Sequence, residues 1–413
     1  MKRCRAALAV AAGVALAMAW PSARQRDVII DVIIIEAERL VTATAAPALP
    51  GFVLVRDGKI ESVSRTIPRG VEGARRLKAR VVTPGLIDAR TTLGLAGLTP
   101  VDDESNEASA PNQAHLRAVD AYNLREPLLR AALQSGVTTV QTGPGRADSI
   151  GGQVGIFHTA GESVSDATIR FPSALVLSLT EAAKTTYAGA APKVPTTRMA
   201  NVGLIRQAFV DAGQYARRLK DAKPPDRDLK HDALVEVLER RIPALVTAER
   251  VDEIATALRL RDEFGFRLLL AGANDATLIA DRLASNQVPV LAGPPTDGPV
   301  ESGTPQERAR VPALLDRAGV RFAIVSGDGR VRPRVTLLQQ VAGAVASGLP
   351  ADAALSAVTI HAARILGLDD RLGSIERGKD ADLVLFDGDP LSYATHVTAV
   401  LIGGRVVFER SGS

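Results

Sequence analysis

Histidine side chains carry much of the metal and proton chemistry of proteins, because imidazole titrates near neutral pH and is the commonest metal ligand. The chain contains five of them: His115, His158, His231, His361 and His396. No two show the His-x-His or i, i+4 spacing that places two imidazoles on one metal ion. His158 ends an apolar stretch and is the one histidine that could lie near a functional site, but an ordinary surface histidine is the favoured interpretation.

Three carboxylates follow apolar stretches, where the end of a strand would present them. Asp328 lies between two glycines after the stretch 321–325, and could act as a general base or a single metal ligand, or could cap a turn. Glu249 and Glu253 are four residues apart after another apolar stretch. They could exchange protons with a substrate, but acids are also favoured at the start of a helix.

The composition excludes several other kinds of protein. There is no Gly-x-Ser-x-Gly motif, and Cys4 is the only cysteine, so nucleophilic catalysis by serine or cysteine has no support. Aromatic residues make up 3% of the chain, which argues against a stacking surface for single-stranded nucleic acid. The formal net charge of +4 falls to +1 without the three basic residues of 1–23, so the charge does not indicate a nucleic-acid partner.

Residues 1–23 have the pattern of a signal peptide that is removed on export. A basic stretch at 2–5 precedes an apolar run at 6–20, and small residues follow at 21–23. The alternative is a membrane anchor, but a helix that spans a bilayer needs roughly 20 apolar residues. We therefore expect an exported protein, periplasmic or secreted, that has no stable membrane span after cleavage.

The pattern of apolar residues divides the remaining chain into three parts. Residues 27–83 contain short stretches rich in β-branched residues, with an Asp-Gly hairpin signal at 57–58. Across 84–372, short apolar stretches alternate with helical patterns, which predicts parallel strands in an eight-stranded α/β barrel. An open doubly wound sheet is the alternative, although no G-x-G-x-x-G motif follows the first strand. Residues 373–413 return to short strands, and we expect them to form one small β-domain with 27–83.

Three stretches, at 81–88, 354–368 and 372–384, resemble segments of the amidohydrolase superfamily, especially its imidazolonepropionase-like branch. The first is similar to the start of barrel strand one, the second to a late helix, and the third to the return into the β-domain. The resemblance implies an α/β fold with a TIM-like (β/α)8 barrel plus a small β-sandwich domain built from both chain ends. It also implies hydrolysis of cyclic amides or similar non-peptide C–N bonds by water that a divalent metal such as zinc activates.

The metal ligands that the resemblance implies are mostly absent. The Asp-x-His-x-His pattern of strand one reads Asp-Ala-Arg-Thr-Thr at 88–92. Arg90 cannot ligate a metal, because its guanidinium stays protonated and offers no lone pair, and Thr92 is a poor neutral ligand. The positions after strands five and six, which are histidines in the family, correspond here to Thr247 and Ala271.

Two functions are compatible with this pattern. The first is an exported hydrolase with an atypical site, in which Asp328 activates water and Arg90 polarises a carbonyl group. The second is a non-catalytic binding or partner subunit that keeps the scaffold, as a homo-dimer or together with an active homologue. In both, a small molecule is the substrate or ligand, and the five positions surround one hollow at the C-terminal end of the barrel: Arg90, Thr92, Thr247, Ala271 and Asp328.

Overall fold

The computed structural model describes most of the chain after the first 31 residues. The described ranges are 32–44, 49–69, 71–99, 101–187, 195–294, 303–327 and 336–410. The expected signal peptide at 1–23 and the candidate Asp328 therefore lie outside the described residues. No helix within these ranges is long and apolar enough to cross a membrane.

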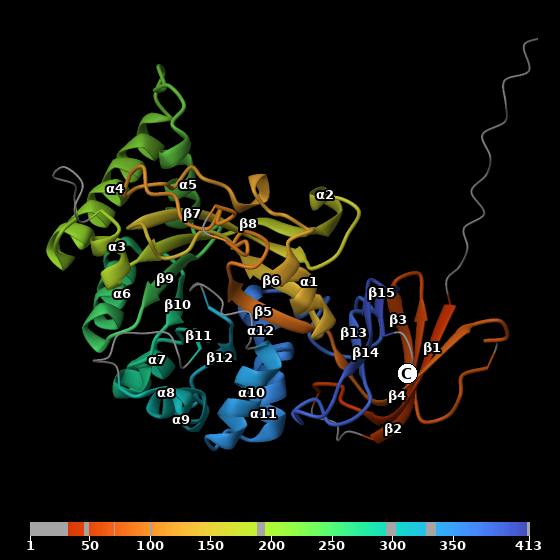
Figure 1. Cartoon of the computed structure of the whole chain (residues 1–413). Coiled ribbons are helices and arrows are strands. Elements are labelled where there is room, and N and C mark those ends of the chain that lie inside the picture. Colours follow the sequence, from red (N-terminus) through yellow and green to blue (C-terminus); the bar gives the residue numbers. More distant parts are fainter. Residues whose placement is uncertain are drawn as a thin grey trace, which may run out of the picture. The chain divides into compact units, whose positions relative to one another are not determined.

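Seven strands from both chain ends form the first sheet, in the order β15-β14-β13-β4-β1-β2-β3 (Figure 1). They are β1 (Val32–Leu40), β2 (Leu49–Arg56), β3 (Lys59–Ser64), β4 (Arg75–Pro84), β13 (Leu383–Phe386), β14 (Val397–Ile402) and β15 (Arg405–Glu409). The two chain ends meet where β4 pairs antiparallel with β13, with Thr83 opposite Val384. The expected β-rich domain built from both ends is confirmed.

Eight strands form the second sheet, in the order β12-β11-β10-β9-β8-β7-β6-β5. They are β5 (Leu86–Thr91), β6 (Val137–Thr142), β7 (Ile150–His158), β8 (Thr168–Ser178), β9 (Ala244–Ala248), β10 (Leu268–Gly272), β11 (Val290–Ala292) and β12 (Phe322–Ile324). The first and last strands meet, because Gly327 N donates to Arg90 O at 3.0 Å and Thr91 forms a bridge with Gly327. The expected TIM-like barrel is confirmed, and the open doubly wound sheet is excluded.

One strand departs from the expected parallel pattern. β7 runs antiparallel to both β6 and β8. The connection from β6 to β7 spans only 143–149, and a parallel crossover needs about a dozen residues or more. The chain therefore reverses at this point, and the prediction of uniformly parallel strands is wrong here.

Helices cover the outside of the barrel (Figure 1). They are α1 (Pro127–Gln134), α2 (Val164–Ala167), α3 (Glu181–Thr185), α4 (Arg198–Arg218), α5 (Leu229–Leu238), α6 (Val251–Phe264), α7 (Ala280–Ser285), α8 (Pro305–Ala309), α9 (Val311–Arg317), α10 (Leu337–Ala346), α11 (Ala351–Ala357) and α12 (Ile360–Leu366), with two short 3-10 turns, η1 (Ala118–Asp120) and η2 (Ala276–Ile279).

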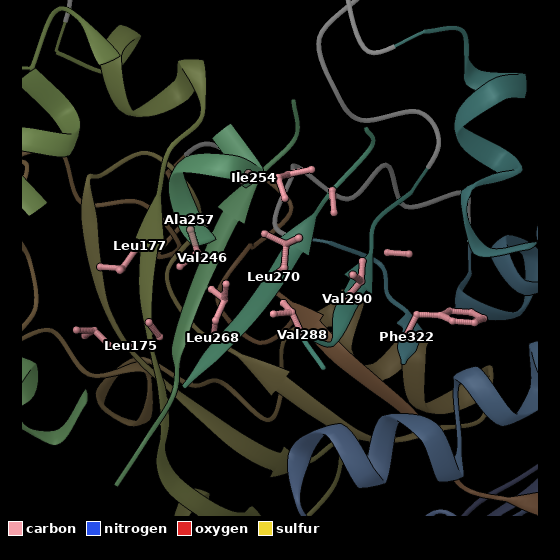
Figure 2. Packing of buried hydrophobic residues seen from close by; sticks show 14 of the residues in the cluster. Leu175, Leu177, Val246, Ile254, Ala257, Leu268, Leu270, Val288, Val290 and Phe322 are labelled. Carbon is pink, nitrogen blue, oxygen red and sulfur yellow. The ribbon is translucent and has the colours of Figure 1, made fainter. Parts of the chain in front are cut away.

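Aliphatic side chains fill the space on both sides of the barrel wall. Figure 2 shows residues of the outer layer, where Val246 and Leu270 of the strands lie near Ile254 and Ala257 of α6. A separate buried cluster contains the alternate residues of the same strands, such as Leu245. This two-sided burial explains why the barrel strands read as continuous apolar stretches.

The junction between β4 and β5 leaves no room for a side chain at Gly85, whose N–H donates to Asp382 O at 2.8 Å. A Cβ atom added to Gly85 would lie 2.2 Å from Oγ1 and 2.9 Å from Cβ of the buried Thr138, so rotation of the threonine cannot relieve the clash. We expect Gly85→Ala to lower the free energy of unfolding by about 1–3 kcal/mol, measured by urea denaturation.

The matched control is Gly203→Ala in the middle of α4, where an added Cβ meets no atom within 4 Å. This substitution is expected to raise the free energy of unfolding by about 0.5–1 kcal/mol, because glycine is unfavourable inside a helix. An equal loss of stability in both variants would contradict the packing argument.

Candidate functional site

The C-terminal ends of the barrel strands lie together, at the end where barrel enzymes of this type carry their catalytic residues. Backbone hydrogen bonds connect the segments there. Leu179 N, directly after β8, donates to Thr247 O of β9 at 3.0 Å, and Gly327 N, shortly after β12, donates to Arg90 O of β5 at 3.0 Å. Side chains that leave these strand ends are therefore held on a rigid framework.

Arg90 is buried at the end of β5, with 1% of its surface exposed. Its Nη2 donates to the carbonyl oxygen of Pro144, at 2.6 Å, in the loop between β6 and β7. Arginine cannot lose its proton in a protein, so this end of the barrel contains a permanent, buried positive charge.

Asp88 lies two residues before Arg90 and is also buried. Its Oδ1 accepts the N–H of Ser326 at 3.1 Å, and Ser326 Oγ donates to Thr91 Oγ1 at 2.8 Å. Burial raises the pKa of the Asp88 carboxyl to about 6, and the hydrogen bonds from Ser326 and the charge of Arg90 reduce this rise. Asp88 therefore joins the two strands that close the barrel, directly beside the site.

The remaining sequence-predicted positions lie at the same end. Thr247 and Ala271 are opposite each other in the register of β9 and β10, and both are buried. Thr92 directly follows β5 and is buried as well. The structure thus places Arg90 and Thr92 at one strand end and brings Thr247 and Ala271 together on two neighbouring strands, while Asp328 lies outside the described residues.

Two acids that the sequence singled out have different surroundings. Glu253 Oε2 accepts the backbone N–H of Glu249 at 2.9 Å and that of Arg250 at 3.2 Å, as expected of an acid at the start of a helix. Glu249, directly after β9, forms an ion pair with Arg146 of the loop between β6 and β7. Glu253 therefore has a structural role, and Glu249 belongs to the polar lining of the strand ends.

A buried acid that sequence reasoning missed lies in the same loop. Asp148 is 2% exposed, and Tyr187 donates its hydroxyl hydrogen to Asp148 Oδ1. Burial raises the pKa of Asp148 to about 7, and nearby Glu107 adds to the rise. Ser149 O accepts the N–H of Ser178, at the end of β8, at 3.1 Å, so Asp148 lies beside the strand ends. No motif marks this residue; its only signal is a polar loop between two apolar strands.

His158, the one histidine that the sequence left as a candidate for the functional site, lies elsewhere. It ends β7, and because β7 runs antiparallel, this residue is at the opposite end of the barrel. Its Nδ1 is 3.4 Å from Oδ2 of the buried Asp382, next to β13 of the β-domain. His158 therefore lies away from the candidate site, because the antiparallel direction of β7 places it at the other end of the barrel from Arg90.

The donor set does not fit the divalent metal that the fold implies. Histidine, cysteine or carboxylate ligands are needed in groups of three or more, and no such group occurs among the residues that the structure describes. Arg90 lies where the resemblance to the family places the first metal ligand, and a fixed positive charge there repels a cation. The arrangement is suited instead to binding an oxygen that carries partial or full negative charge.

The buried Asp148 carboxyl should make stability depend on pH. Its pKa is 3.8 when unfolded and about 7 when folded, so between these values the folded state holds a proton that the unfolded state has lost. The contribution of Asp148 to stability therefore falls as the pH rises from 4 to 7. We subtract the unfolding free energy of the unsubstituted protein from that of Asp148→Asn, each measured by urea titration. We expect this difference to rise by about 1–3 kcal/mol as the pH increases from 4 to 7.

The control for the loss of one negative charge is Asp281→Asn on the exposed surface of α7. If Asp148→Asn and Asp281→Asn shift stability equally at pH 4 and pH 8, the burial of Asp148 has no part in the pH dependence.

Known proteins are similar in sequence to this chain across both the β-domain and the barrel. A sequence model of the amidohydrolase family matches residues 247–407. Amidohydrolase tasK of Hapsidospora irregularis is 26% identical over 397 residues, which cover 87% of this chain and 40% of that protein, so the chain spans less than half of that relative. Imidazolonepropionase of Mesorhizobium japonicum is 27% identical over 340 residues, which cover 75% of this chain and 78% of that protein.

A solved structure agrees more closely. The crystal structure of an amidohydrolase from Thermotoga maritima superposes with a TM-score of 0.85 at 32% sequence identity, covering 92% of this chain and 100% of that chain. The two proteins therefore share the barrel and the β-domain, with 32% sequence identity, over nearly the whole length of this chain. This chain belongs to the amidohydrolase superfamily, in its imidazolonepropionase-like branch.

Proposed function

We propose that this protein hydrolyses a non-peptide C–N bond of a small molecule, with a cyclic amide as the substrate class, at the C-terminal end of the barrel. The Arg90 guanidinium takes the place of a metal as the group that binds the carbonyl oxygen. Water adds to the carbonyl carbon as Asp328 removes one of its protons, the C–N bond breaks, and Asp328 passes that proton to the leaving nitrogen. The relative named imidazolonepropionase supports a ring-containing substrate.

The burial of Arg90 is the observation that carries the proposal. A guanidinium with 1% exposure, fixed by Pro144 O, is a preorganised donor in a site of low dielectric constant. Fixed donors of this kind stabilise the negative charge that develops on a carbonyl oxygen when water attacks, and removal of one costs about 100–1000-fold in rate.

Asp328 is the proposed general base that takes the proton from water. It lies outside the described residues, so its support comes from the chain just before it. Ser326 N is held by Asp88 Oδ1, and Gly327 N is held by Arg90 O. Asp88 is thus a positioning residue, because its carboxylate fixes the segment that leads to Asp328.

A non-catalytic binding or partner subunit is the second candidate. Thr247 and Ala271 correspond to the positions that are metal-binding histidines in the family, after the fifth and sixth strands of the barrel. This favours the non-catalytic candidate, because neither side chain can take up or transfer a proton at neutral pH. Such a protein would bind the same small amides through Arg90 but release them unchanged.

Arg90→Gln tests the proposal on the purified protein with a panel of cyclic amides. We expect hydrolysis by the unsubstituted protein to persist after dialysis against a chelator, and kcat/KM of Arg90→Gln to fall by about 100-fold or more. Arg90→Lys, which keeps the charge, should recover part of the loss. Arg76→Gln, an exposed position on β4, is the matched control and should leave the rate unchanged.

Three results would change this conclusion. A stoichiometric zinc, manganese or iron ion by elemental analysis, with activity lost on chelation, would contradict a metal-independent site. Binding of the amides without hydrolysis would favour the non-catalytic candidate. Equal loss of rate in Arg90→Gln and Arg76→Gln would remove Arg90 from the mechanism.

We also propose that residues 1–23 direct export to the periplasm or medium and are then removed. Their basic, apolar and small-residue segments support this. Cell fractionation and mass measurement of the mature chain test it, and a full-length chain in the cytoplasm would contradict it. A homo-dimer, or an assembly with an active homologue, is proposed as well and is tested by size-exclusion chromatography with light scattering.

A further inference from the structure

A cavity of about 690 Å³ opens at the N-terminal end of the barrel, opposite the end that carries Arg90. Its wall is formed mainly by the segments that lead into β9, β10, β11 and β12, by the first part of β8 and by the end of α12, and Arg261 of α6 and Gln141 of β6 complete it. Seven arginines line the cavity, and none of the described lining residues is an aspartate or a glutamate. Positive charge is therefore concentrated here.

Acids just outside the cavity neutralise two of these arginines. Arg241 pairs with Glu236 and Glu239, and Arg261 pairs with Asp262. The other five form no ion pair within the part of the chain that the structure describes. They are Arg170, Arg240, Arg267, Arg321 and Arg364.

Backbone carbonyl groups hold three of the five in place. Arg267 Nη2 donates to Arg241 O at 2.9 Å, and Arg321 Nη2 donates to Gln287 O at 2.6 Å. Arg170 Nη1 donates to Leu366 O at 2.8 Å. A carbonyl oxygen orients a guanidinium but leaves its net positive charge uncompensated, so these contacts arrange charges around the opening without neutralising them.

We propose that this cavity binds a compact polyvalent anion, and that a diphosphate group is the chemistry that fits it. The planar guanidinium group pairs its donors with two phosphate oxygens at once, and several such groups around one hollow match the several negative charges of a diphosphate. The volume lies within the range of small-molecule sites, about 300–1000 Å³.

The shape and lining favour a small ligand over a nucleic acid. The charges surround a hollow instead of following a ridge or groove that could track a phosphate backbone. Phe266 is the only aromatic residue among the described lining residues, and it is 2% exposed, so no ring is available for base stacking. The ligand is therefore recognised through its charge alone.

Isothermal titration calorimetry of the full chain with inorganic pyrophosphate tests this. We expect one site, and a Kd that rises roughly tenfold when Arg364 is replaced by glutamine. Arg364 forms no side-chain hydrogen bond or ion pair among the described residues, so Arg364→Gln should leave the thermal melting temperature unchanged. Arg321→Gln should weaken binding by a similar factor, and Arg377→Gln, an exposed position outside the cavity, is the matched control.

Parallel titrations with ADP and with orthophosphate identify the source of the anion. Binding of ADP as tight as that of pyrophosphate supports a diphosphate group carried by a larger molecule, and tighter binding of free pyrophosphate supports the inorganic ion. No heat with pyrophosphate, or equal weakening in Arg364→Gln and Arg377→Gln, would overturn the proposal. A single-stranded oligonucleotide that binds more tightly than pyrophosphate would also overturn it.

Discussion

The closure of the barrel between β5 and β12 is the constraint on which the rest of the site depends. Three hydrogen bonds form this seam: Gly327 N to Arg90 O, Ser326 N to Asp88 Oδ1, and Ser326 Oγ to Thr91 Oγ1. The seam buries a carboxyl and a guanidinium close together, and each reduces the cost of burying the other. The residues that close the fold therefore include those to which the proposed chemistry is assigned, so a change at Asp88 or Arg90 is expected to affect stability and the proposed function together.

The reversal of one strand has a comparable influence on which residues meet. Because β7 runs antiparallel, the loop that precedes it lies at the C-terminal end of the barrel and supplies three polar contacts there: the carbonyl group of Pro144, the ion pair of Arg146 with Glu249, and the buried Asp148. In a regular (β/α)8 barrel the start of a strand lies at the other end, where it contributes to stability and not to the site.

Arginine side chains place positive charge at both ends of the barrel, but they differ in number and in burial. Arg90 is single and buried, which suits the charge that develops on one oxygen during a reaction. The arginines at the opposite end are numerous and exposed to the cavity, which suits a ligand that is already multiply charged. The two ends of one scaffold can thus recognise different ligands without sharing a residue.

The sequence was enough to predict the fold, because alternating apolar stretches and three ordered motifs at 81–88, 354–368 and 372–384 are local patterns that survive the loss of individual site residues. It also predicted that Arg90, Thr92, Thr247 and Ala271 lie at the ends of barrel strands, since each lies at a fixed distance along the chain from a motif or a strand. Contacts between distant segments could not be found in this way. Three features depend on which segments meet in space: the direction of β7, the burial of Asp148 against Tyr187, and the arginine cavity. The number of residues between two segments in the sequence does not determine whether they meet in the folded protein.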